Sequence, residues 1–289
     1  MIILFLALSI VLATMRNILS KEISGYSFGE KRFFLAQSII FLTGSLILLL
    51  GIKTHLRAVS PLTILYALIY GILLITAQYC YTTALKKGNV GICSTVYSLG
   101  FIFPTLSGAV FWDETLTVFN IIGVLLVIPV IILTGLKSNG EKYATSKNGY
   151  IIPLTAAMLA SGGLGIMQKV QQNSICAEQK DVFLICAFVL AGTVSFVFYL
   201  FLIHADKSVI QHKKIISAGG IGTAFALSNM MNTILAGKLD SAVFFPVLNV
   251  GTIIFSLLLG MVLYKEKFTR KDTAALSLGI IAILLITLL

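Results

Sequence analysis

Several polar side chains lie within long apolar segments of this 289-residue chain. In a membrane such groups are costly and normally face a cavity or another helix. An arginine there can pair with a carboxylate, and amides and hydroxyls can orient a bound solute. We predict the following binding residues: Arg16, Gln78, Tyr79, Tyr97, Ser98, Gln168, Asn229, Asn232 and Asn249.

Each of these residues has a structural alternative. Amides and hydroxyls also join helices within membranes, at about 0.6 kcal/mol per hydrogen bond. Arg16 lies about 6 Å past the middle of its segment at helical rise, where an arginine facing lipid costs about 2.5–3.5 kcal/mol. We therefore expect Arg16 to face a water-filled cavity, and Lys169, nearer a segment end, to snorkel. Asn229 and Asn232, three residues apart, should share a helix face.

Chemical catalysis is not indicated. All eleven Asp and Glu residues fall at segment ends or between segments, and so do His55, His204 and His212. The four cysteines form no CxxC pair. Without an acid–base pair, a nucleophile–base pair or a metal cluster inside the segments, the sequence predicts no enzyme, no cofactor and no metal.

The segments themselves define the fold class. The chain is 58% hydrophobic and 11% charged, whereas soluble domains carry about 25% charged residues. A span of about 30 Å of hydrocarbon needs roughly 20 apolar residues. We predict an all-α integral membrane protein with ten transmembrane helices, at residues 2–22, 33–51, 61–85, 89–111, 117–136, 150–173, 182–203, 215–236, 240–263 and 270–289.

The second five segments repeat the first five. Residues 85–120 align without a gap on residues 237–272 at an offset of 152, which also pairs Arg16 with Gln168 and Tyr97 with Asn249. Because five is odd, the second copy must be inverted, with a cavity expected where the copies meet. The predicted organisation is a first repeat at 1–136, a polar linker at 137–149 and a second repeat at 150–289.

Charge is distributed unevenly between the loops. Fifteen Lys and Arg residues follow odd-numbered segments and four follow even-numbered ones. Short basic loops stay cytoplasmic, so we expect a multi-pass cell-membrane protein with both termini outside. The net charge of +10 is thus explained by orientation on the lipid bilayer, and no nucleic-acid partner is predicted.

Two local patterns have structural explanations. Glu114 and Thr117 in the first copy match Glu266 and Thr269 in the second, and each Thr can cap the helix that follows it. Asn120 or Asp272 stands three residues after the Thr. The glycine runs at 162–165 and 219–222 lie in apolar helices and follow no strand, so they favour close helix packing over phosphate binding.

The ten segments, the duplicated unit and this repeated turn resemble the drug/metabolite transporter superfamily, in particular its EamA-type ten-helix members. Ala84, Leu85, Pro104, Gly108, Glu114, Thr117 and Gly123 fit the family's pattern. The second half departs from it, because Ser256 stands where Pro104 is expected and Pro246 lies ten residues earlier. A helix irregularity is therefore expected at different places in the two halves.

The resemblance implies a cavity lined by the first, third, fourth, sixth, eighth and ninth spans. We predict a secondary transporter of a small polar or zwitterionic solute, such as an amino acid or related metabolite, working by alternating access. Tyr79, Tyr97 and Phe101 could cover an apolar part of that solute. A multidrug or cationic-solute exporter is the main alternative, and a membrane-embedded enzyme or scaffold is a further one. The pattern leaves the oligomeric state open and is compatible with a monomer.

Overall fold

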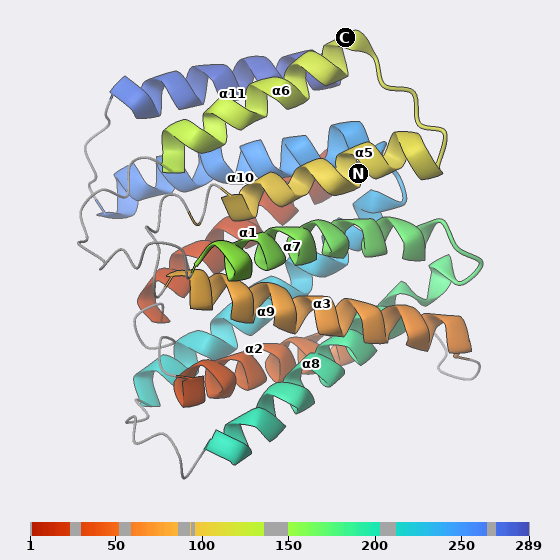
Figure 1. Cartoon of the computed structure of the whole chain (residues 1–289), viewed down its shortest axis with the longest axis vertical. Coiled ribbons are helices and arrows are strands. Elements are labelled where there is room, and N and C mark those ends of the chain that lie inside the picture. Colours follow the sequence, from red (N-terminus) through yellow and green to blue (C-terminus); the bar gives the residue numbers. More distant parts are fainter. Residues whose placement is uncertain are drawn as a thin grey trace. The chain divides into compact units, whose positions relative to one another are not determined.

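The computed structural model describes residues 2–23, 30–51, 59–85, 93, 96–135, 150–202, 212–264 and 270–288. Within these ranges the chain is helical and contains no strand (Figure 1). The helices are α1 (Ile2–Ile23), α2 (Glu30–Leu50), α3 (Pro61–Leu85), α5 (Ile102–Phe111), α6 (Val118–Gly135), α7 (Ile151–Gln172), α8 (Lys180–Leu202), α9 (His212–Ala236), α10 (Ser241–Tyr264) and α11 (Arg270–Leu288). Two 3-10 turns, η3 (Leu99–Phe101) and η4 (Ala177–Gln179), precede α5 and α8.

Four stretches of the described chain are long and apolar enough to cross a membrane, judged by length and composition. They are Lys31–Leu50, Pro61–Ala84, Ile151–Gln172 and Ala177–Leu202. Shorter apolar helices occur at Ile2–Arg16, Val96–Phe111, Val118–Leu133, Ser241–Ser256 and Thr273–Ile286. Large apolar side chains such as Ile3, Ile152 and Phe201 stay exposed, as expected for surfaces that face lipid rather than water.

The helix boundaries repeat at the offset seen in the sequence. Moving α2, α3 and α6 forward by 152 residues places their ends within two residues of the ends of α8, α9 and α11. The agreement extends well outside the stretch where residue identities match. The boundaries of these three pairs of helices thus recur at the same offset as the sequence match.

The chain folds into two compact units, and each takes helices from both halves of the sequence. Unit 1 comprises residues 1–75 and 167–237, and unit 2 comprises residues 76–166 and 238–289. Unit 1 contains α1, α2, α8 and α9, and unit 2 contains α5, α6, α10 and α11. Helices α3 and α7 contribute residues to both units.

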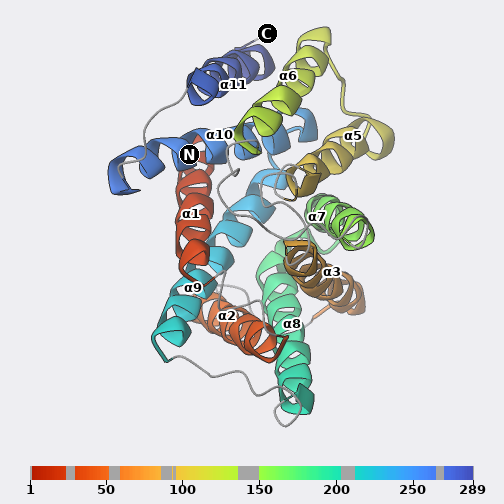
Figure 2. The ribbon, with the colours of Figure 1, turned by 60° about the vertical axis from the view of Figure 1, so that its left-hand side comes forward.

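In unit 1, α1 packs on α9, and α2 packs on both α8 and α9 (Figure 2). The Ser9 hydroxyl bonds to Asn232, and Arg16 lies over Phe225. Advancing seven residues along α1 thus moves its partner back seven residues along α9, so the two helices are antiparallel. Helices α2 and α9 run parallel, because Ile40 lies against Gly222 and the next residue, Phe41, lies against Phe225, three residues farther along α9.

Glycines in α7 and α9 allow close approach to neighbouring segments, as the sequence predicted, at three of the positions described below. A Cβ added to Gly222 would lie 2.3 Å from the Ile40 carbonyl oxygen. A Cβ on Gly162 would lie 2.8 Å from the Gly100 carbonyl oxygen, and one on Gly165 would lie 2.7 Å from Pro104 Cγ. Gly219, by contrast, has nothing within 4 Å of an added Cβ. Close packing is confirmed at three positions of the two runs and does not apply to Gly219.

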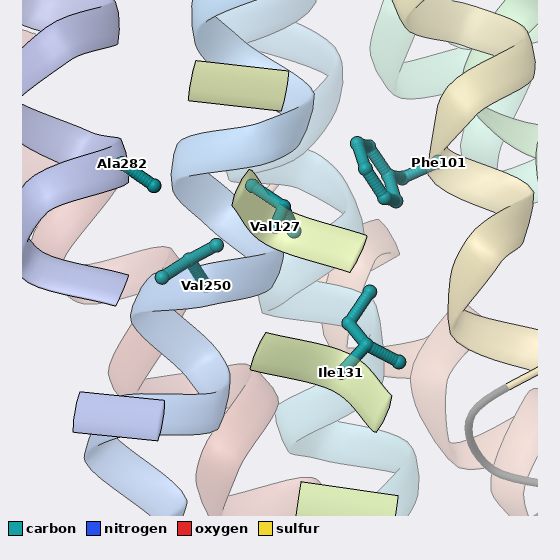
Figure 3. Packing of buried hydrophobic residues seen from close by; sticks show 5 residues of the cluster. All are labelled: Phe101, Val127, Ile131, Val250 and Ala282. Atoms are coloured by element: carbon teal, nitrogen blue, oxygen red, sulfur yellow. The ribbon is translucent and has the colours of Figure 1, made fainter. Parts of the chain in front are cut away.

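The hydrophobic core of unit 2 joins α6, α10 and α11 to the start of α5. Figure 3 shows Phe101, Val127, Ile131, Val250 and Ala282, all 5% exposed or less. Phe101 was expected to cover part of a solute, but its ring belongs to this core instead.

Helix α6 begins with the predicted Thr cap. The Thr117 hydroxyl accepts the Asn120 N–H, and Asn120 Oδ1 accepts the Thr117 N–H, both at 3.1 Å. Each side chain thus satisfies a backbone donor at the other residue, as in a capping box. Asn120 Nδ2 also donates to the Ile286 carbonyl at 3.3 Å, which ties α6 to α11. The matching Glu266 and Thr269 lie outside the described residues, as does the predicted linker at 137–149.

The helix irregularity lies in the first half. The 3-10 turn at Leu99–Phe101 ends where α5 begins, which places Pro104 in the first turn of α5. A proline is tolerated there because the first-turn N–H groups have no partner within the helix. Helix α10 runs without interruption from Ser241 to Tyr264, past Pro246. Within the described residues the two halves therefore differ, but the irregularity expected near Pro246 in the second half is absent.

Candidate functional site

Three buried polar side chains meet in unit 1, one each from α3, α7 and α9. Tyr70 Oη donates to Asn229 Oδ1 at 2.6 Å. Gln168 Nε2 lies 3.0 Å from Tyr70 Oη and 3.3 Å from Asn229 Oδ1. Asn229 Nδ2 donates to the Phe225 carbonyl at 2.8 Å. Tyr70 is 1% exposed and the two amides 5%, so we call these three residues the buried triad.

A second polar contact joins α1 to α9. The Ser9 hydroxyl donates to Asn232 Oδ1, and Asn232 is half-buried. Asn229 and Asn232 were predicted to share a helix face, yet Asn229 bonds to α3 and α7 whereas Asn232 bonds to α1. Two asparagines three residues apart on α9 therefore contact different helices.

Arg16 is the cation among the candidates. Its Cζ lies 4.9 Å from the centroid of the Phe225 ring, and its side chain is half-buried. A guanidinium attracted to an aromatic face has five N–H donors arranged in a plane. Contact with the ring is therefore compatible with hydrogen bonds from the guanidinium edge to a carboxylate.

Lys169 corrects one expectation. It is 5% exposed, so the prediction that it snorkels from the end of its helix was wrong. The end of α7 is covered by the turn that follows it, where Gln171 Nε2 donates to the Cys176 carbonyl at 3.0 Å. Asp181, in the first turn of α8, is also buried, at 7% exposed. Lys169 and Asp181 both lie near helix ends, as the sequence predicted, yet their side chains are buried in unit 1.

The remaining candidates belong to unit 2. Gln78, Tyr79, Tyr97 and Ser98 are all half-buried. The Tyr97 ring lies against Tyr81, with centroids 4.6 Å apart. Asn249 is half-buried, and its Nδ2 donates to the Phe245 carbonyl of its own helix at 2.9 Å.

Sequence reasoning missed two participants, Tyr70 and Ser9. Both were read as part of apolar helices, and neither stands next to another polar residue. A signal was nevertheless present, because a Tyr in the middle of a span needs a partner for its hydroxyl. A systematic search for every mid-span hydroxyl would have found both.

The repeated Glu of the turn motif has a partner in unit 2. Glu114 Oε2 accepts the Ser241 N–H at 2.7 Å, and Glu114 Oε1 accepts the Ser241 hydroxyl at 3.3 Å. Ser241 is the first residue of α10. A carboxylate there satisfies a free backbone donor and interacts favourably with the positive end of the helix dipole. Glu114 therefore caps a helix from the other half of the sequence.

This contact predicts the effect of neutralising Glu114. Glu114→Gln keeps an oxygen acceptor for Ser241 and loses the charge, so the variant should lose about 1 kcal/mol of stability, measured by thermal unfolding of the purified protein. Asp113→Asn is the matched control, because Asp113 is exposed and its replacement also removes one negative charge. Asp113 has φ 52°, a backbone conformation that Asn also tolerates.

For the transport activity that the family resemblance implies, the pH profile should keep its shape in Asp113→Asn, Glu114→Gln and Glu266→Gln, since none of these residues lies within a predicted span. A shifted profile in any of them would assign a titrating role to a group that we interpret as structural.

The described residues contain no group of three or more His, Cys, Asp or Glu able to hold a metal ion. Apart from Glu114, Lys169 and Asp181, the polar side chains described above are amides, hydroxyls and the arginine Arg16, on apolar helices. Such an arrangement can bind a polar solute or join helices. The four stretches long and apolar enough to cross a membrane indicate an all-helical membrane protein.

Comparisons with known proteins agree with this class. Residues 1–136 match the EamA-like transporter family, which confirms the resemblance seen in the sequence. The match covers somewhat less than half of the chain, and over that range the chain is similar to this transporter family. Members of this family are transporters and not enzymes.

Solved structures support the fold. Among them, 28 chains match. One, described only as the crystal structure of a protein, has a TM-score of 0.74 and 17% sequence identity, and the match covers 99% of this chain and 96% of that one. At this identity the likeness concerns the fold alone. No curated protein matches the chain.

Proposed function

We propose that this protein is a secondary transporter of a small polar or zwitterionic organic solute, such as an amino acid or related metabolite, and that it works by alternating access. One observation carries the choice of solute: Arg16, a half-buried cation within α1, beside a face of α9 that carries Asn232. A cation and an amide two helical turns apart on the contact between α1 and α9 suit a solute that has a carboxylate and, farther along, hydrogen-bond donors.

The candidate residues divide into two roles. In unit 1, Arg16 is proposed to pair with the solute carboxylate, and Asn232 is proposed to contribute its amide to the same face of α9. In unit 2, Gln78, Tyr79, Tyr97, Ser98 and Asn249 remain candidates from the sequence, with the two tyrosines for a less polar part of the solute and the amides for its ammonium group. Gln168 and Asn229 position α3, α7 and α9 through the buried triad, because their hydrogen bonds already go to Tyr70 and to each other.

The inverted five-plus-five repeat is part of the proposal. It is supported by the constant offset of the helix boundaries and by the pairing of matched helices. Helix α2 packs on α8, α5 on α10 and α6 on α11, and each pair is related by the 152-residue shift. Packing of these three helices against their own counterparts supports a two-fold relation between the halves. Both termini are proposed to lie outside the cell.

Uptake into proteoliposomes across a panel of solutes tests this function. The panel contains zwitterionic amino acids, their uncharged analogues, organic anions and lipophilic cations. We expect saturable uptake of at least one zwitterion, absent from protein-free vesicles. Transport of the cations alone would instead identify a cationic-solute exporter, and transport of no member would refute the proposal.

A further inference from the structure

Three buried phenylalanine rings meet in unit 1, one each from α2, α8 and α9. Between ring centroids, Phe41 lies 5.7 Å from Phe188 and 6.0 Å from Phe225, and Phe188 lies 5.5 Å from Phe225. Phe41 and Phe188 are fully buried, and Phe225 is 6% exposed. Aromatic rings attract one another at such distances. These three residues, which we call the phenylalanine cluster, therefore fix the plane of the Phe225 ring.

Two neighbouring contacts hold this cluster in place. Gly44 of α2 makes room for the Phe188 ring, because a Cβ at Gly44 would lie 2.7 Å from Phe188 Cδ1. The Phe225 carbonyl accepts the hydrogen bond from Asn229 Nδ2, and Asn229 is joined to α3 and α7 through the buried triad. Phe225 is thus held by the neighbours of its ring and, one turn later on α9, by the triad.

Arg16 approaches this fixed ring from α1. Its Cζ lies 4.9 Å from the Phe225 centroid, and its side chain is half-buried. A cation within about 6 Å of an aromatic face is attracted by the charge distribution of the ring, and more strongly where water is excluded. The N–H donors of a guanidinium lie in its own plane, and attraction to a ring face does not use them. The ring can therefore hold the cation while its donors bind a carboxylate.

We propose that Phe225 is a positioning residue, which holds the Arg16 guanidinium where it can bind the carboxylate of a solute. This role rests on the proposed function, because it requires a carboxylate-bearing solute. A long arginine side chain has many rotamers to lose on binding, and contact with a fixed ring restricts them before the solute arrives. The phenylalanine cluster, which is apolar and buried, thus acts on the solute through Arg16.

Thermal unfolding of the full-length protein without solute tests the contact. Mono-, di- and trifluorinated phenylalanine at position 225 closely keep the shape of the ring and progressively weaken the negative charge of its face. We expect fluorination to lower the unfolding midpoint when residue 16 is Arg, and to change it little in the Arg16→Gln background.

Phe34 provides the matched control, because it is also buried and lies two turns before Phe41 on α2. The same fluorinated series at position 34 should change the midpoint equally in the two backgrounds. Equal changes at position 225 in the two backgrounds would show that Phe225 only fills space, and would overturn the proposal.

Uptake into proteoliposomes tests the effect on the solute. Half-saturating concentrations are measured for the zwitterionic amino acid that the panel identifies and for its uncharged analogue. Trifluorinated phenylalanine at position 225 should raise the value for the amino acid about five-fold. The value for the analogue and the maximal rates should stay unchanged.

The two measurements separate this role from the function on which it rests. If unfolding shows the contact with Arg16 but both solutes change equally in uptake, the positioning role is wrong and the transport proposal stands. If no zwitterion is taken up, the transport proposal is refuted and the positioning role is refuted with it.

Discussion

Arg16→Gln is expected to weaken binding of carboxylate-bearing solutes by ten-fold or more and to spare a neutral analogue. A buried hydrogen bond to a charged group contributes about 1.5–3 kcal/mol, and about 1.4 kcal/mol corresponds to ten-fold in affinity. Glutamine keeps a polar side chain but removes the charge. The measurement is the concentration of solute that half-saturates uptake into proteoliposomes, taken in parallel for an amino acid and its uncharged analogue.

Two controls separate a binding role from a structural one. Arg16 also lies over Phe225, so its loss could loosen the contact of α1 with α9. Arg16→Lys keeps the charge and loses the planar fork of donors, and it should retain part of the preference for the carboxylate. If Arg16→Gln weakens both solutes equally, or if the variant fails to insert in the membrane, Arg16 is structural and the assignment of the carboxylate fails.

Gly222→Ala should destabilise the protein, and Gly219→Ala, on the same helix, should not. A Cβ on Gly222 would lie 2.3 Å from the Ile40 carbonyl oxygen and 3.1 Å from Ile40 Cα. Backbone atoms cannot move aside as a side chain can, so α2 and α9 must separate, at about 1–3 kcal/mol for overpacking. Gly219 has open space, and its replacement should add about 0.5–1 kcal/mol of helix stability.

Thermal unfolding of the two purified variants beside the wild-type protein measures this difference. The expected order of midpoints is Gly219→Ala at or above wild type, and Gly222→Ala below it. Equal midpoints in both variants would mean that α2 and α9 do not pack at Gly222, and the parallel arrangement of these helices would have to be reconsidered.

Helix positions could be predicted closely from the sequence because apolar segment length carries most of the information. The predicted spans at 61–85 and 150–173 differ from α3 and α7 by at most one residue at each end. The Thr117 cap was also predictable, since both of its partners lie within one turn. Such features depend on residues close together in the chain.

Contacts between distant residues could not be predicted in this way. Tyr70 and Asn229 are 159 residues apart, and Glu114 and Ser241 are 127 residues apart. Periodicity indicates that a side chain is polar and lies within a span, but it does not indicate which helix lies opposite. The sequence repeat suggested a division at 137–149, whereas the compact units combine helices from both halves. That combination depends on packing between helices.

Counterflow in proteoliposomes tests the central claim most directly. Vesicles are loaded with an unlabelled zwitterionic solute from the uptake panel and diluted into buffer containing a trace of the same solute with a radioactive label. A carrier that exposes one site alternately to the two sides predicts a transient accumulation of label inside, above its outside concentration, reduced in Arg16→Gln. Label that only equilibrates with the outside concentration, or enters protein-free vesicles equally fast, would contradict transport by alternating access.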